Sequence, residues 1–269
     1  MDKHHIFCIH GLGKHDNDWV NVGDDISPSF DHFFHRIVGR YDQALADSIV
    51  LHSIHYDDLI EKLLKEWETH LDAFSAIATK NPLFKETSAF FSSLATELKQ
   101  SEEQEKVWRS HLVDLLLFAG LPSIKDALLT YVGKQFINKV RNISAADDNA
   151  YFSVLSHSMG TAVAEKAIKA LFNEGIDGDT LKGDLKLESI TMVANTSYLL
   201  SRDKKNFFNS DFKPGSSAGA ICSIMFSVNH KLDPVGRYLP FDPDNDWLTE
   251  DQKSRFYDIR LKRLSSPPI

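Results

Sequence analysis

The chain has 269 residues, of which 42% are hydrophobic and 25% charged, and its formal net charge is −8. This length suits one large α/β domain with a full core, or two small domains. The acidic balance, without any basic run, argues against nucleic acid as a partner. The start of the chain leads directly into a strand-like run, and no apolar run approaches the roughly 18 residues that span a bilayer, so we expect neither a signal peptide nor a transmembrane segment. Cys8 and Cys222 lie in apolar strand-like runs, which indicates buried, reduced thiols and a cytoplasmic location.

The first predicted element is a short buried strand over residues 6–10, which ends in His10-Gly-Leu-Gly13. A glycine-containing turn after an early strand can direct a backbone N–H at a developing oxyanion. The amide of Leu12 is the candidate donor. The alternative is an ordinary glycine-rich turn. A dinucleotide-binding fingerprint is excluded, because the third glycine of that motif is missing.

Helical spacing follows over residues 24–40, and residues 48–54 read as the second strand. His52 and His55 fall within that strand or at its end, and we expect them to be packed or surface histidines. No cluster of cysteine, histidine and acidic residues has the spacing of a metal site, so neither a metal nor another cofactor is expected.

Between residues 57 and 143 the pattern is helical only. This segment is far longer than one crossover helix requires, so we interpret it as a helical cap or lid inserted into a single domain spanning 1–269. Its most apolar stretch, residues 113–119, is suited either to contact an acyl chain or to pack between the cap and the sheet.

A strand-like run over residues 151–155 then leads into Ser156-His-Ser-Met-Gly160 and a helical pattern. A strand, a tight turn with serine at its apex and a helix form the nucleophile elbow of α/β-hydrolases. Ser158 is the apex and the candidate nucleophile, and the amide of Met159 is the second candidate oxyanion donor. The alternative is an ordinary strand–turn–helix connection.

Three further strands are predicted at 187–194, 220–228 and 255–264. Asp233 follows the second of them, where the acid belongs when a triad runs in the order Ser, Asp, His. The alternative for Asp233 is an Asp-Pro turn without a chemical role.

Acyl transfer also needs a base to accept the serine proton, yet no histidine follows His230. Three explanations stay open: a histidine encoded beyond Ile269, His230 itself as the base, or an inactive binding protein.

With His10-Gly-Leu-Gly13, Ser156-His-Ser-Met-Gly160 and Asp233-Pro-Val235 in this order, the chain resembles α/β-hydrolases of the serine esterase and lipase type. Asp126-Ala-Leu-Leu-Thr-Tyr131 and the stretch 230–240 are similar to the phospholipase A1-like DDHD group. The resemblance covers about 1–56 and 124–264, and it lacks that group's C-terminal histidine-bearing segment. It implies a mostly parallel sheet of about six strands flanked by helices, together with the inserted cap.

The expected function is that of a serine hydrolase that cleaves a carboxylic ester, which could be a lipid ester, through an acyl-Ser158 intermediate. In this scheme Asp233 orients the base, and Leu12 and Met159 supply the oxyanion donors. An amidase or thioesterase with the same residues and a non-catalytic binding protein on the same fold are the alternatives. The expected partner is a small-molecule or lipid ester, transient contact with a membrane surface stays open, and the sequence does not define an oligomeric state.

Overall fold

The computed structural model describes residues 2–11, 15, 17–23, 28–63, 65–66, 122–181, 185–197, 212–217, 220–230 and 249–261. The chain divides into two compact units. We call the first, made of residues 1–11, 15–55 and 129–269, the sheet unit; the second comprises 12–14 and 56–128. In the second unit residues 57–63 are helical. Most of the expected cap, residues 67–121, lies outside the described residues, and residues 129–143 belong to the sheet unit.

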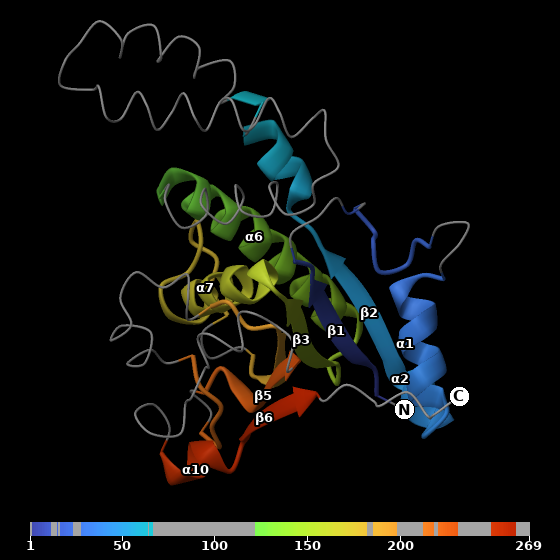
Figure 1. The fold of residues 1–269 in the computed structure, drawn as a ribbon. Coiled ribbons are helices and arrows are strands. Elements are labelled where there is room, and N and C mark those ends of the chain that lie inside the picture. Colours follow the sequence, from blue (N-terminus) through green and yellow to red (C-terminus); the bar gives the residue numbers. More distant parts are fainter. Residues whose placement is uncertain are drawn as a thin grey trace, which may run out of the picture. The chain divides into compact units, whose positions relative to one another are not determined.

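The sheet unit contains a six-stranded, all-parallel sheet with the strand order β2-β1-β3-β4-β5-β6 (Figure 1). Its strands are β1 (His4–Ile9), β2 (Ile49–Ile54), β3 (Tyr151–His157), β4 (Leu187–Val193), β5 (Cys222–His230) and β6 (Phe256–Leu261). The labelled helices are α1 (Phe30–Gly39), α2 (Gln43–Ser48), α6 (Pro122–Ala146), α7 (Met159–Asn173) and α10 (Glu250–Lys253). The α/β class and the parallel sheet of about six strands are confirmed.

The direction of chain winding reverses at β1. The chain first steps from β1 outward to β2, and it then returns past β1 to β3 and continues through β4 and β5 to β6. Because parallel crossovers are right-handed, steps in opposite directions place their helices on opposite faces of the sheet. Accordingly α1 and α2 lie on one face, and α7 and the 129–146 part of α6 lie on the other (Figure 1).

The α6/α7 face carries the larger part of the core. Phe7 of β1 is fully buried, and its ring centroid lies 4.7 Å from that of Phe136 in α6. Helix α7 approaches the sheet closely because its inner positions include the small buried residues Ala162 and Ala167. Strand β1 is covered on both faces and therefore need not alternate between apolar and polar residues, which explains its near-continuous apolar run.

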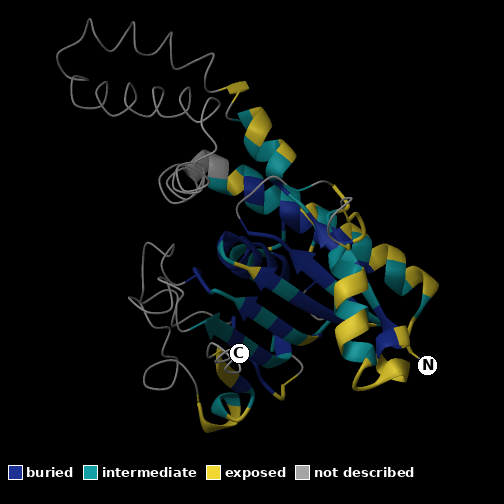
Figure 2. Cartoon of the chain, turned by 45° about the vertical axis from the view of Figure 1, so that its right-hand side comes forward, coloured by how far each residue is buried: buried dark blue, intermediate teal, exposed yellow. Residues whose placement is uncertain are grey.

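The opposite face is covered over β1 and β2 by α1. Cys8, Val20, Ile49 and Leu51 form a buried cluster there, and Phe30 and Phe34 of α1 pack against it. In Figure 2 the central strands are dark blue, whereas α1 shows teal and yellow. At the other edge of the sheet Tyr257, Ile259 and Leu261 of β6 are each at least 40% exposed. The other residues after Phe256 are exposed as well, because β6 is the edge strand of the sheet.

Element boundaries differ modestly from expectation. Helix α1 begins at Phe30 because Ser29 caps it by accepting a hydrogen bond from the amide of His32, and residues 24–27 lie outside the described residues. Helix α6 ends at Ala146, three residues beyond the expected helical segment 57–143, and the six-residue helix α2 was not predicted. Among the described residues, no helix has both the length and the apolar character required to cross a membrane.

Candidate functional site: a strained serine at the switch point of the sheet

Ser158 lies between the last residue of β3 and the first residue of α7, in a backbone conformation that is rare for a side-chain-bearing residue. Its φ is 51° and its ψ is −128°. Only a few per cent of non-glycine residues have positive φ, and such strain costs on the order of 1–3 kcal/mol. The sharp turn leaves Ser158 partly exposed, while Ser156 and Met159 on either side of it are buried. A strained strand-to-helix turn that presents a serine is the geometry expected of a nucleophile elbow.

Gly160 explains how α7 starts so close to the sheet. A Cβ atom added at this position would overlap the carbonyl oxygen of His10 and come within 2.8 Å of that of Ile9. Both obstacles are backbone atoms of β1 and its end, which cannot move aside as a flexible side chain would. The close approach of α7 to β1 therefore requires glycine two positions after Ser158.

Gly11 brings the end of β1 against the elbow. A Cβ atom added at Gly11 would lie 2.8 Å from His157 Nδ1 and 3.0 Å from the Ser158 Cβ. The glycine turn and the serine thus meet at the carboxyl ends of β1 and β3, on either side of the point where the chain winding reverses. In open α/β sheets ligands bind at this topological switch point.

Of the two expected oxyanion donors, one can be located. The amide of Met159 opens α7, and the first N–H groups of a helix have no acceptor within the helix. These groups and the positive end of the helix dipole favour an anion. Leu12 lies outside the described residues, although Gly11, its neighbour in sequence, lies beside Ser158.

The expected acid and base are only partly described. His230 is the last residue of β5 and is partly buried at the same edge of the sheet as Ser158. Since β4 separates β3 from β5, the two strand ends are about 10 Å apart, or two strand spacings. Asp233 lies outside the described residues. Among the described residues, no side chain hydrogen bonds to the Ser158 hydroxyl.

A segment that the sequence analysis did not single out contacts the elbow directly. Residues 194–197 follow β4, and Thr196 Oγ1 donates a 2.9 Å hydrogen bond to the carbonyl oxygen of Ser158. Asn195 Oδ1 accepts hydrogen bonds from the amide and hydroxyl of Ser197, and the Asn195 Nδ2 atom is buried without a partner. The signal in the sequence is the run Asn-Thr-Ser at the end of a strand, but its relevance depends on β4 lying next to β3.

The histidines of the sheet unit pack mostly against other rings. His52 lies within 2.8 Å of His5, measured from His5 Nδ1 to His52 Nε2, and the two rings stack. Burial is the main cause that lowers the pKa of His52 to about 4, and His5 contributes. His10 is 2% exposed and stacks on His15 with ring centroids 4.1 Å apart. The expectation that His52 is a packed histidine is confirmed.

Comparison of the chain with protein-family models, with curated proteins and with solved structures found no match. What the structure establishes is an α/β fold with a six-stranded parallel sheet flanked by helices. The candidate site is a strained serine between β3 and α7, beside Gly11, which follows β1.

Proposed function

We propose that this protein is a serine hydrolase that cleaves a carboxylic ester through an acyl-Ser158 intermediate. The observation that carries the proposal is the backbone of Ser158, with φ 51° and ψ −128° at the junction of β3 and α7. A chain retains such strain only where its surroundings enforce it, and enforced strain clusters at active sites. The location at the switch point of the sheet supports the same conclusion.

The proposed reaction has two stages. The Ser158 oxygen attacks the ester carbonyl carbon while a base accepts the hydroxyl proton, and the resulting oxyanion is stabilised by the amide of Met159 and by that of Leu12. Collapse of this intermediate breaks the bond to the alcohol, which leaves with the proton from the base. Water then attacks the acyl-serine through the same base, releasing the carboxylic acid and restoring Ser158.

The base is His230, oriented by Asp233, or a histidine on a segment outside this chain. His230 shares the carboxyl edge of the sheet with Ser158, but its strand end is about 10 Å away. A contact with the serine therefore requires the side chain to reach across the end of β4.

One observation favours a non-catalytic binding protein as the second candidate: among the described residues, nothing hydrogen bonds to the Ser158 hydroxyl. Catalytic hydrogen bonds are often long in unliganded enzymes, so this arrangement also fits the hydrolase. Turnover separates the two candidates, because a binding protein retains an ester without cleaving it.

The proposal is tested by hydrolysis of p-nitrophenyl esters with acyl chains of increasing length, with matched thioester and amide substrates. We expect ester cleavage to fall by about 10³-fold or more in Ser158→Ala. Loss of activity in His230→Ala would identify that residue as the base. An inactive chain that gains activity when extended by a histidine-bearing segment would assign the base to that segment. Activity that persists in Ser158→Ala would refute the proposal.

A further inference from the structure

The carbonyl oxygen of Ser158 accepts an unusual number of hydrogen bonds. It accepts from the amide of Thr161 at 2.8 Å, from the hydroxyl of Thr161 at 2.7 Å and from the hydroxyl of Thr196 at 2.9 Å. Thr161 belongs to α7, whereas Thr196 follows β4, so the donors come from two separate elements. On the other side of the residue, the Ser158 amide donates to the carbonyl oxygen of Val193 at 2.9 Å.

The two threonines are themselves fixed. Thr161 is fully buried and Thr196 is 4% exposed. The backbone amide of Thr196 donates to Thr161 Oγ1 at 2.9 Å, and the two hydroxyl oxygens lie 3.3 Å apart. Both hydroxyls lie within hydrogen-bond distance of the same carbonyl oxygen, so each can donate its single proton there. We call this pair of side chains, with the bonds they make to Ser158, the threonine clasp.

The clasp acts on the peptide group that joins Ser158 to Met159. A peptide group is planar and trans, so its C=O and its N–H point in opposite directions. Holding the Ser158 carbonyl oxygen from one side therefore aims the Met159 N–H at the other side, where the oxyanion donor is required. The same bonds set ψ of Ser158, which fixes the strained turn on which the hydroxyl is presented.

We propose that Thr161 and Thr196 are positioning residues, which hold the Ser158–Met159 peptide in the orientation that places the nucleophile and the oxyanion donor together. This inference rests on the proposed function of Ser158. Neither threonine is assigned a contact with substrate. Their role is to keep a strained peptide in the single orientation that serves acyl transfer, without reorganisation during the reaction.

Thr196→Val is the most informative variant. It is nearly isosteric and removes one hydroxyl, and the Ser158 carbonyl retains both bonds to Thr161, so no buried group loses its last partner. Thr196→Ser restores the hydroxyl. Thr180→Val is the control for loss of a threonine hydroxyl bound to an α7 carbonyl, because the exposed Thr180 donates through Oγ1 to the carbonyl of Leu171 at 3.0 Å. Leu171 lies thirteen residues along the helix from Ser158, which is about 20 Å.

The experiment measures the rate at which a fluorophosphonate probe modifies each protein over a range of probe concentrations. We expect Thr196→Val to lower the maximal rate by about tenfold or more with little change in the half-saturating concentration, because small misplacements of reacting groups slow chemistry steeply. Thr196→Ser should stay within about threefold of the unmodified chain, and Thr180→Val should react at its rate. A Thr196→Val protein that reacts normally, or an equal loss in Thr180→Val, would overturn the inference.

Amide hydrogen exchange over residues 156–162 separates the clasp from the proposed function. We expect faster exchange in Thr196→Val than in Thr180→Val, because the Ser158–Met159 peptide is then held by fewer bonds. If neither the unmodified chain nor a chain extended by a histidine-bearing segment reacts with the probe, the hydrolase proposal and the catalytic role of the clasp both fail. In that case hydrogen exchange alone tests whether the clasp restrains the backbone. Unchanged exchange in Thr196→Val would overturn this restraint as well.

Discussion

Ser158 occupies the N-cap position of α7, yet its side chain makes no capping hydrogen bond. A serine at this position ordinarily accepts from an amide in the first helical turn and stabilises the helix by about 1 kcal/mol. Here φ is 51°, which turns the side chain away from that role and leaves its hydroxyl available. Local rules of this kind are broken mainly at functional sites, where another part of the structure compensates. The threonine clasp is the compensating part.

Gly160 gives the first prediction at the residue scale. In Gly160→Ala the new methyl group would overlap backbone atoms of β1 and His10, so α7 must move away from the sheet. We expect a loss of about 1–3 kcal/mol in the free energy of unfolding, measured by urea denaturation. Gly39→Ala is the control, since its methyl group would come close only to the flexible end of Gln43 and would make an ordinary contact with Ala46 Cβ at 3.7 Å. Equal stability of the two variants would contradict the close packing described for the elbow.

The pair of His5 and His52 predicts a sensitivity to acid. Burial lowers the pKa of both histidines, that of His52 to about 4, so the folded state binds fewer protons than the unfolded chain. The stabilisation is complete above the unfolded pKa of about 6.5 and is lost as the pH falls from there toward 4. His52→Gln should make the free energy of unfolding less dependent on pH between 7 and 5. An unchanged dependence in His52→Gln would contradict this assignment.

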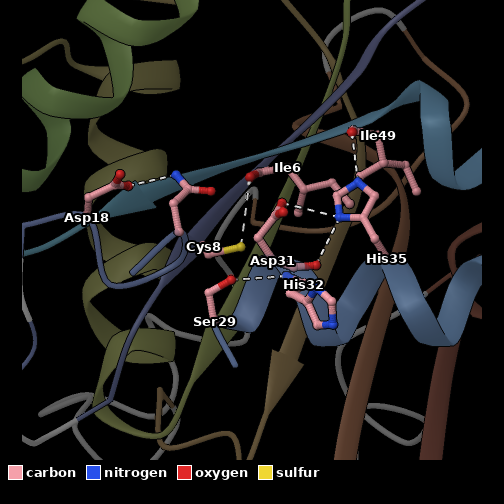
Figure 3. Close-up of polar contacts among 9 residues, drawn as sticks. Ile6, Cys8, Asp18, Ser29, Asp31, His32, His35 and Ile49 are labelled. Carbon is pink, nitrogen blue, oxygen red and sulfur yellow. Dashed lines mark hydrogen bonds and ion pairs between the residues drawn. The ribbon is translucent and has the colours of Figure 1, made fainter. Parts of the chain in front are cut away.

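At the scale of elements, His35 connects α1 to β2 (Figure 3). Its Nδ1 atom lies 2.9 Å from the carbonyl oxygen of Asp31, and its Nε2 atom lies 3.1 Å from that of Ile49. A carbonyl oxygen only accepts, so both ring nitrogens donate at once only when the imidazole is protonated. Burial lowers the pKa of His35, but the bonds to Asp31 and Ile49, the Asp31 carboxylate and the Ala46 backbone outweigh it, and the net pKa is raised.

The stabilisation from this contact depends on pH in the opposite direction to that from the pair of His5 and His52. Because the folded pKa of His35 is raised, its stabilisation is present below about pH 6.5 and is lost as the pH rises through the raised value. We expect the amides of α1 to be less protected from hydrogen exchange at pH 8.5 than at pH 6, after correction for intrinsic rates. In His35→Gln that difference should disappear, and α7 serves as the internal control. A pH-dependent difference that survives in His35→Gln would assign it to another group.

The sequence predicted the elements that have a clear pattern along the chain. It missed a very short helix and a contact that forms only between neighbouring strands. The strands of the sheet unit were predicted because buried parallel strands are near-continuous apolar runs. Helix α2 was missed because six residues are too few for a periodic pattern, and its cap at Asp42 is the main local signal. The elbow was predicted at Ser158, since a strand, a turn and a helix in succession are visible in the chain. Thr196 was not predicted, because its contact with Ser158 exists only through the pairing of β3 with β4.

At the scale of the whole molecule, the sheet order brings Gly11 and Ser158 together from distant parts of the sequence. The motif order along the chain suggested this meeting, but only the position of β1 beside β3 establishes it. The same order also places the two cysteines in one sheet, Cys8 in β1 and Cys222 in β5. Both thiols are buried, and burial raises the pKa of each to about 12.

The thiols therefore report on the integrity of the sheet. We expect neither cysteine to react with a thiol reagent at pH 8 in the native protein, because the thiolate is the reactive form and both groups are inaccessible. In urea both should react, with a common midpoint if the sheet unfolds as one cooperative unit. Rapid native labelling of either thiol would contradict the burial described here, and two separate midpoints would show that the sheet does not unfold cooperatively.

The most direct test of the account is the site of covalent modification by a fluorophosphonate. Such probes report a serine that is activated as a nucleophile, and mass spectrometry of the digested protein locates the adduct. We predict one adduct, on the peptide that contains Ser158, and none in Ser158→Ala. An adduct on another residue, or labelling that persists in Ser158→Ala, would contradict the assignment of Ser158 as the nucleophile.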